Sequence, residues 1–343
     1  MGISWRNLKT TTPPAELEQQ LIATAADAVQ KAAQDSGGWW RLNQLRNRSR
    51  ELISTFLTRT AQNARAVVTG AAQAGRLAAE QDLHAALLPV VAADADIEVA
   101  ANARREVTDR IAATAPTAIR SGDRLYSQAL AAIIAQPAAS RAHRLRVAQG
   151  VLDDLSAAGI TGFVDKAGRN WNLVSYVEMA TRAVALNAAI DAHVGTLAAN
   201  DQHLVVVSAA TACCDLCAPW DGSVLAIDDS GSSGGEVAGT LAEARDAGLF
   251  HPNCRCVIDR WSEGDPIPEV IAPDPEAYAA TQRLRSLERQ VRASKRVRAA
   301  ALDDLATHAA NTRIRVLQKR IREHIGATDV RRQRHREQIG RAL

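Results

Sequence analysis

Aromatic residues are scarce in this sequence of 343 residues, where Phe, Trp and Tyr together make up 3%. The apolar content is nevertheless 47%, and small aliphatic residues, above all Ala, supply most of it. Such side chains suit closely packed helices better than a large sheet. We therefore expect a mainly α-helical fold with one small α+β module, and the apolar content excludes an intrinsically disordered chain.

Long apolar runs are also absent. No stretch approaches the roughly 18 uncharged apolar residues that a membrane span requires, and no positively charged, apolar leader opens the chain. We expect a protein without a membrane segment that is made in the cytoplasm. Thiols stay reduced there, so clustered cysteines favour metal binding or reactivity over disulfides.

Cysteine is missing everywhere except in one window, Cys213 to Cys256. The window contains a C-x-x-C pair and an H-x-x-C-x-C group, and two short loops that each supply two ligands are a common way to build a tetrahedral zinc site. The sequence predicts a structural Zn²⁺ site made by four of five candidate ligands: Cys214, Cys217, His251, Cys254 and Cys256. Cys213 is expected to take no part, because adjacent side chains point in different directions. A buried, reduced cluster without metal is the alternative.

Acidic residues become rare towards the end of the chain. Residues 275–343 contain 17 Lys and Arg against 7 Asp and Glu, a local charge of +10, so the rest of the chain sums to 3 − 10 = −7. Such asymmetry is typical of a basic segment that faces nucleic acid or an acidic partner, although a solvated helix face is the plainer interpretation. The residues expected to bind the nucleic acid or the acidic partner are Arg313, Arg315, Lys319, Arg320, Arg322, Arg331, Arg332, Arg334 and Arg336.

Composition divides the chain into four predicted ranges. Residues 1–158 form a helical N-terminal region with a long helical pattern over 41–88, and residues 159–262 form the α+β module with the Cys/His cluster. A Pro-rich linker follows at 263–275, and a basic helical tail occupies 276–343. In the tail, Ile314, Leu317, Ile321 and Ile325 recur at helical spacing.

Within the module, local signals predict several elements. A hairpin should turn at residues 165–168, and residues 203–209 have the β-branched character of a strand. Ser175 with Glu178 reads as a capping box that opens a helix, and Thr240 with Glu243 reads as a second one. Residues 228–239 are polar and Gly-rich and should form a surface loop.

The succession "GITGFVDKAGRNW", "SYVEMATR", "VVVSAATACCDLCAPWDGSVL" and "AGLFHPNCRC" resembles the phage minor capsid protein 2 family, a relative of the phage Mu F-like head morphogenesis proteins. The resemblance covers about residues 150–262. Position 256 is often His in similar sequences and is Cys here, which keeps a possible ligand at that position. It leaves open whether His251 or Cys256 completes a metal site.

The resemblance implies a virion protein of a tailed bacteriophage, present in several copies inside the head and made in the host cytoplasm. Its implied partners are the portal protein, the major capsid protein and packaged double-stranded DNA, with roles in head assembly, DNA packaging or ejection. A zinc-stabilised DNA-binding protein without a virion role is an alternative. Members of the wider group are likened in fold to ADP-ribosyltransferases. A second alternative is therefore an ADP-ribosyltransferase-like enzyme that uses Glu178. We expect no enzyme and no catalytic residues, because no convincing Arg, Ser and Glu set can be assembled.

Overall fold

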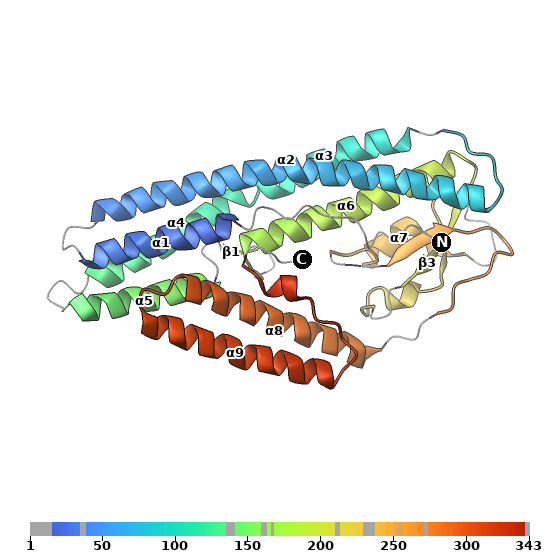
Figure 1. The fold of residues 1–343 in the computed structure, drawn as a ribbon. Helices are drawn as coiled ribbons and strands as arrows, with labels where there is room; N and C mark the ends of the chain where they lie inside the picture. The colour runs from blue at the N-terminus through green and yellow to red at the C-terminus, as the bar shows by residue number, and fades with distance from the viewer. Residues whose placement is uncertain are drawn as a thin grey trace. The chain divides into compact units, whose positions relative to one another are not determined.

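The computed structural model describes residues 16–34, 39–92, 94–134, 141–158, 163–165, 168–209, 213–228, 237–252, 254, 256–270 and 274–339. Most of the predicted polar loop at 228–239 lies outside these residues. The described chain is mainly helical (Figure 1). It also contains a small four-stranded sheet, and this confirms the expected fold class. No described helix is both long and apolar enough to cross a bilayer.

The helices begin and end close to where the sequence patterns change. Their bounds are α1 Glu16–Gln34, α2 Trp39–Ala85, α3 Ala95–Ala112, α4 Ala115–Ile134, α5 Arg141–Ala158, α6 Leu173–Ala198, α7 Leu241–Asp246, α8 Pro275–Ala299 and α9 Asp304–Gly326. The chain forms two compact units. The first contains the described residues of 61–110 and 179–279, and the second contains those of 12–60, 111–178 and 280–343. These units are defined by contacts, whereas the four predicted ranges were defined by composition. The units therefore do not test the four ranges, which remain a prediction.

The first unit contains the sheet, in the order β5-β4-β3-β6. Strand β3 (Leu204–Ser208) pairs in antiparallel fashion with β4 (Val224–Ala226) and with β6 (Val257–Arg260), and β5 (Val237–Thr240) adds to β4 in parallel. The run of valines in β3 explains its central place, because a strand with neighbours on both sides buries its β-branched side chains. Val206, Val224 and Trp261 pack together as part of the core.

The second unit contains a short hairpin and several packed helices. Strands β1 (Phe163–Val164) and β2 (Asn170–Trp171) pair in antiparallel fashion, which confirms the predicted hairpin. Helices α1, α4 and α5 pack on one another. Helices α8 and α9 form a second apolar cluster, in which the predicted stripe Ile314, Leu317 and Ile321 is buried against α8 and Ile325 is partly buried.

Arg296 joins three helices of the second unit. Its Nε donates to the Ser156 carbonyl (2.8 Å) and its Nη2 to the Ala157 carbonyl (3.2 Å), which are two of the unsatisfied acceptors at the C-terminal end of α5. Its Nη1 also lies 3.3 Å from the Glu18 carboxylate of α1. Both charged side chains are buried, so this pair depends on its hydrogen bonds to offset desolvation.

The predicted start of α6 was wrong by a few residues. The helix begins at Leu173, and the Asn172 side chain accepts the amide of Val174 at 3.1 Å, so Asn172 caps it. Asn172 also donates to Glu18. Ser175 therefore lies inside the helix, and Glu178 is buried instead of completing a capping box. By contrast, the predicted box of Thr240 and Glu243 is present at the start of α7.

Helices α2 and α6 approach each other closely at Gly75. A Cβ atom added to Gly75 would lie 2.0 Å from the carbonyl oxygen of Ala189, a backbone atom that cannot move aside as a side chain can. Ala71, Ala72 and Ala79 of α2 are also buried. Small residues therefore set the distance between these two helices in the first unit.

Replacing Gly75 with Ala should destabilise the protein by about 1–3 kcal/mol or more, because the extra methyl group overpacks the α2–α6 contact. Gly70→Ala is the matched control: Gly70 lies on the same helix, is exposed and has nothing within 4 Å of an added Cβ. It should stabilise by up to about 1 kcal/mol, the difference in helix propensity. Thermal unfolding of both variants checks this, and equal effects would contradict it.

Candidate metal centre and basic surface

The sheet brings the two cysteine-containing loops to the same place. Because β3 and β6 are antiparallel, with Ser208 opposite Val257, the end of β3 lies beside the start of β6. The loop that carries Cys214 and Cys217 follows β3, and the loop that carries His251, Cys254 and Cys256 precedes β6. Ordinary strand pairing thus joins segments that are 37 residues apart.

The first loop is a tight turn. The amides of Cys217 and Ala218 both donate to the Cys214 carbonyl at 3.0 Å, which directs the two C-x-x-C sulfurs to one side. A 3-10 helix (Ala218–Trp220) follows. Asp221 closes the base of the loop, because its carboxylate accepts the Ala209 amide at 2.7 Å. We did not predict this role of Asp221, although its Asp-Gly dipeptide is a turn signal.

The second loop begins where α7 ends. Gly248 has a φ of +106°, and an added Cβ would lie 3.3 Å from Leu216 of the first loop, so the missing side chain permits close approach. Phe250 is buried and also has a positive φ, +60°. A buried aromatic residue rarely adopts this conformation, and no local motif predicts it. The turn continues with a 2.8 Å hydrogen bond from the Cys254 amide to the His251 carbonyl.

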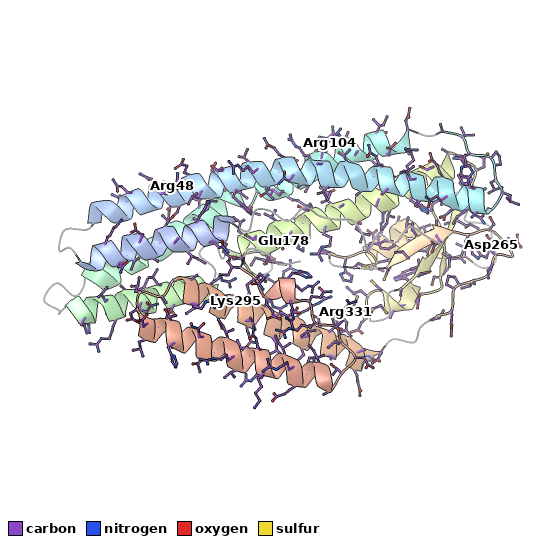
Figure 2. All side chains as sticks on the ribbon, viewed as in Figure 1. Arg48, Arg104, Glu178, Asp265, Lys295 and Arg331 are labelled. Carbon is purple, nitrogen blue, oxygen red and sulfur yellow. The ribbon has the colours of Figure 1, made fainter. Side chains whose placement is uncertain are left out.

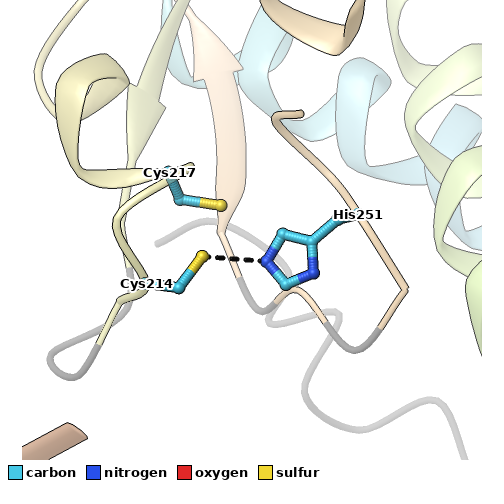
Figure 3. A group of neighbouring side chains, drawn as sticks. All are labelled: Cys214, Cys217 and His251. Carbon is cyan, nitrogen blue, oxygen red and sulfur yellow. Dashed lines mark hydrogen bonds between the residues drawn. The ribbon is translucent and has the colours of Figure 1, made fainter. Parts of the chain in front are cut away.

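The five predicted ligands lie together in two overlapping groups. Cys214, Cys217 and His251 form one group (Figure 3), and Cys217, Cys254 and Cys256 form the other; within each group the ligand atoms all lie within 4.8 Å of one another. The Cys214 Sγ is 3.0 Å from His251 Nε2, and the Cys217 Sγ is 3.5 Å from the Cys254 Sγ. Cys217 belongs to both groups, so it lies at the centre of the cluster.

His251 is oriented as a metal ligand usually is. Its Nδ1 lies 2.9 Å from the Pro252 carbonyl, which can only accept, so Nδ1 carries a proton. In the neutral imidazole, Nε2 then has its lone pair directed at the sulfurs. A hydrogen bond from the second ring nitrogen to a carbonyl is the arrangement that typically fixes the tautomer of a ligating histidine.

The thiols also influence one another. Hydrogen bonds from Cys217 and Cys256 lower the pKa of Cys254, and the Cys256 amide donates to the same sulfur at 3.4 Å. The pKa of Cys217 is raised, chiefly by its hydrogen bond with Cys254. Since metal ligation requires thiolates, a buried site in which one sulfur is already stabilised as an anion suits a cation.

The donor set fits a metal ion that prefers sulfur and nitrogen. Cys217, Cys254 and Cys256 are buried, while Cys214 and His251 are partly exposed. Among the described residues, Cys213 belongs to neither group of donors, and burial raises the pKa of its thiol. The cluster can therefore hold a metal ion without Cys213, and its donors match those of closed structural zinc sites.

The predicted basic residues of α9 form one exposed face. Arg313, Arg315, Lys319, Arg320 and Arg322 are all exposed, opposite the buried stripe of the same helix. No acidic residue occurs between Asp304 and Glu323 in the sequence. Within the described part of the chain, Lys319 forms an ion pair with Glu323 at 3.7 Å, and both side chains are exposed. Such a pair is worth little.

The four predicted arginines after α9 differ from one another. Arg331, labelled in Figure 2, is exposed, and so is Arg334. Arg332 instead forms two hydrogen bonds, of 2.6 and 2.8 Å, with the buried carboxylate of Glu337. Arg336 is partly buried. The segment folds back on α8, where the Gln333 amide donates to Glu288 at 3.1 Å. The structure thus places Arg332 in an internal contact.

Comparison with known proteins identifies the family. A model of the family described as phage minor capsid protein 2 matches residues 15–326. The chain belongs to the phage minor capsid protein 2 family. The match extends well beyond the 150–262 range of the sequence resemblance and includes the N-terminal helices, α8 and α9. No curated protein and no solved structure matches the chain.

Glu178 is the residue that an enzymatic role of this minor capsid protein would need. It lies on α6 (Figure 2) and its side chain is 3% exposed. It is one of the charged groups near Arg292, whose pKa is lowered by burial and by Arg296 and is raised by Glu18 and Glu178. A buried carboxylate beside Arg292 is poorly placed to reach a substrate, and this position favours a structural role for Glu178.

Proposed function

We propose that this minor capsid protein lies inside the head of a tailed bacteriophage, in several copies, in contact with the portal protein and the major capsid protein. There it assists head assembly, DNA packaging or ejection. The observation that carries the proposal is the family match over residues 15–326, which reaches from the first described helix to the end of α9. A capsid family implies a virion location, and the basic face of α9 suits a compartment filled with DNA.

Mass spectrometry of purified particles tests this role. The protein should be present in mature virions, in few copies relative to the major capsid protein, and should copurify with the portal protein after mild disassembly. Protein that accumulates free in infected cells while virions lack it would contradict the proposal. That result would favour the alternative of a DNA-binding protein without a virion role.

We propose further that the Cys/His cluster binds one Zn²⁺ per chain as a structural site. Four ligands are drawn from Cys214, Cys217, His251, Cys254 and Cys256. The support is the donor chemistry, the orientation of His251 by Pro252, and the two turns that hold the sulfurs. When bound, zinc would contribute folding free energy by linking two loops that share a small sheet. The two turns keep the donors close to one another, and three of the sulfurs are buried.

Cys217→Ser should abolish zinc retention and lower the melting temperature, because Cys217 belongs to both donor groups. We expect a loss of about 3 kcal/mol, or roughly 6–12 °C for a unit of this size. Cys213→Ser is the matched control and should keep zinc and stability. Elemental analysis and thermal unfolding of protein purified without added metal give the answer. His251→Ala and Cys256→Ser then show which side chain is the fourth ligand.

The basic face of α9 is proposed to bind the phosphates of double-stranded DNA without sequence specificity. Residues 313–322 place five positive side chains along about 13.5 Å of helix, at 1.5 Å per residue. Each phosphate contact releases counterions, so binding should weaken steeply with salt. Arg332 is not part of this face, since its guanidinium is held by Glu337.

A triple variant, Arg315→Gln with Lys319→Gln and Arg322→Gln, should weaken binding of a 30-base-pair duplex. The slope of log K against log salt should fall by about 2 to 3, or 0.9 per lost contact. The matched control changes Arg104, Arg105 and Arg110, exposed residues of α3, to Gln, which alters net charge equally. Fluorescence anisotropy measures both. Equal losses in the two variants would contradict a specific role for α9 and leave an acidic protein surface as its partner.

A further inference from the structure

The connection between α2 and α3 has an unusual residue at the end of α2. The Leu88 amide donates to the Leu83 carbonyl (2.9 Å) and the Leu87 amide to the His84 carbonyl (3.0 Å). These two bonds define a Schellman motif, in which the residue at the position of Leu87 adopts the left-handed conformation. Leu87 indeed has a φ of +58°. Glycine usually occupies this position, because a side chain there is strained.

Two other helices of the same unit end in the same way, and they show what is unusual about Leu87. Helix α7 ends with Gly248 at the left-handed position, and α6 ends with Asp201, at a φ of +55°. Gly is the favoured residue there, and Asp is tolerated better than an aliphatic side chain. Only α2, among these three described helices, ends with an aliphatic residue, and the Leu87 side chain is 94% exposed. The protein therefore bears backbone strain and an exposed leucine at one position.

The connection also presents other apolar side chains. Val91 and Ile97 are each 62% exposed. The backbone of Val91 is held by Asn200 of α6, whose side chain accepts the Val91 amide (2.6 Å) and donates to the Val91 carbonyl (3.2 Å). A connection fixed in this way loses little conformational freedom on binding, which favours affinity. Strained backbone positions cluster at functional sites, and the one at Leu87 presents an apolar side chain to solvent.

The charges around this connection indicate the kind of partner. Residues 77–103 contain five acidic residues and no Lys or Arg. Glu80 and Asp96 are neutralised in part by Arg76, but Asp94 and Glu98 are exposed. Negative charge disfavours DNA and anionic lipid surfaces. It is complementary to a protein pocket with basic residues at its rim.

We propose that Leu87, with Val91 and Ile97, docks into an apolar pocket with a basic rim on another protein of the phage head. This inference rests on the proposed virion role for the identity of the partner, while the docking residues follow from the connection itself. Leu87 is the central contact, and Asn200 is a positioning residue that keeps the connection in its binding conformation.

The test compares Leu87→Gly, Leu87→Asn and Asp201→Gly in the full chain. Both Leu87 variants keep a residue that tolerates the left-handed conformation, and Asp201→Gly relieves the same strain on α6 without removing an apolar side chain. Leu87→Gly and Asp201→Gly should raise the melting temperature by a few degrees at most. The purified portal and major capsid proteins of the same phage are the binding probes, measured by biolayer interferometry.

Both Leu87 variants should bind one of these two proteins roughly tenfold to a hundredfold more weakly than the natural chain, as expected for an apolar side chain of this size, while Asp201→Gly binds normally. Unchanged binding by the Leu87 variants would overturn the proposal. So would failure of the natural chain to bind either probe, or self-association that Leu87→Gly abolishes. The presence of the chain in virions distinguishes failure of this docking from failure of the proposed function.

Discussion

The contact between two loops at the edge of a four-stranded sheet is the interaction on which the small α+β module depends. Strands β4, β5 and β6 have three or four residues each. Such short strands give little stability alone. Antiparallel pairing of β3 with β6 brings the loops together, and Cys214, Cys217, His251, Cys254 and Cys256 then fill the space between them. Four of the five are thiols, and the only nitrogen donor is held by a backbone carbonyl. The geometry is that of a cross-link between loops.

Local signals in the sequence were sufficient for much of the fold. The capping box at Thr240, the hairpin after β1 and the apolar stripe of α9 are encoded within a few residues, and all are present. The start of α6 was misjudged because Ser175 and Glu178 match a capping pattern equally well. Asn172, which caps the helix, also contacts the buried Glu18, 154 residues away in the sequence. No window of the sequence contains that information.

At the candidate site, too, local sequence signals were informative, whereas contacts between distant residues could not be predicted. The spacing of the cysteines and His251 was enough to select five donors that lie together, since the C-x-x-C turn is local. Charge patterning was less informative for the basic residues. Arg332 and Arg334 are separated by one residue, yet Arg332 faces the buried Glu337 and Arg334 faces solvent. Nothing in the sequence indicated the left-handed conformation of Leu87, because the glycine that normally marks the end of a helix is absent there.

X-ray absorption at the zinc edge reports on the metal ion that we propose joins the two loops. Protein purified without added metal should contain zinc with three or four sulfur neighbours at about 2.3 Å and no more than one nitrogen at about 2.0 Å. A spectrum dominated by oxygen and nitrogen neighbours, or a folded protein that contains no metal, would rule out a zinc cross-link between the loops.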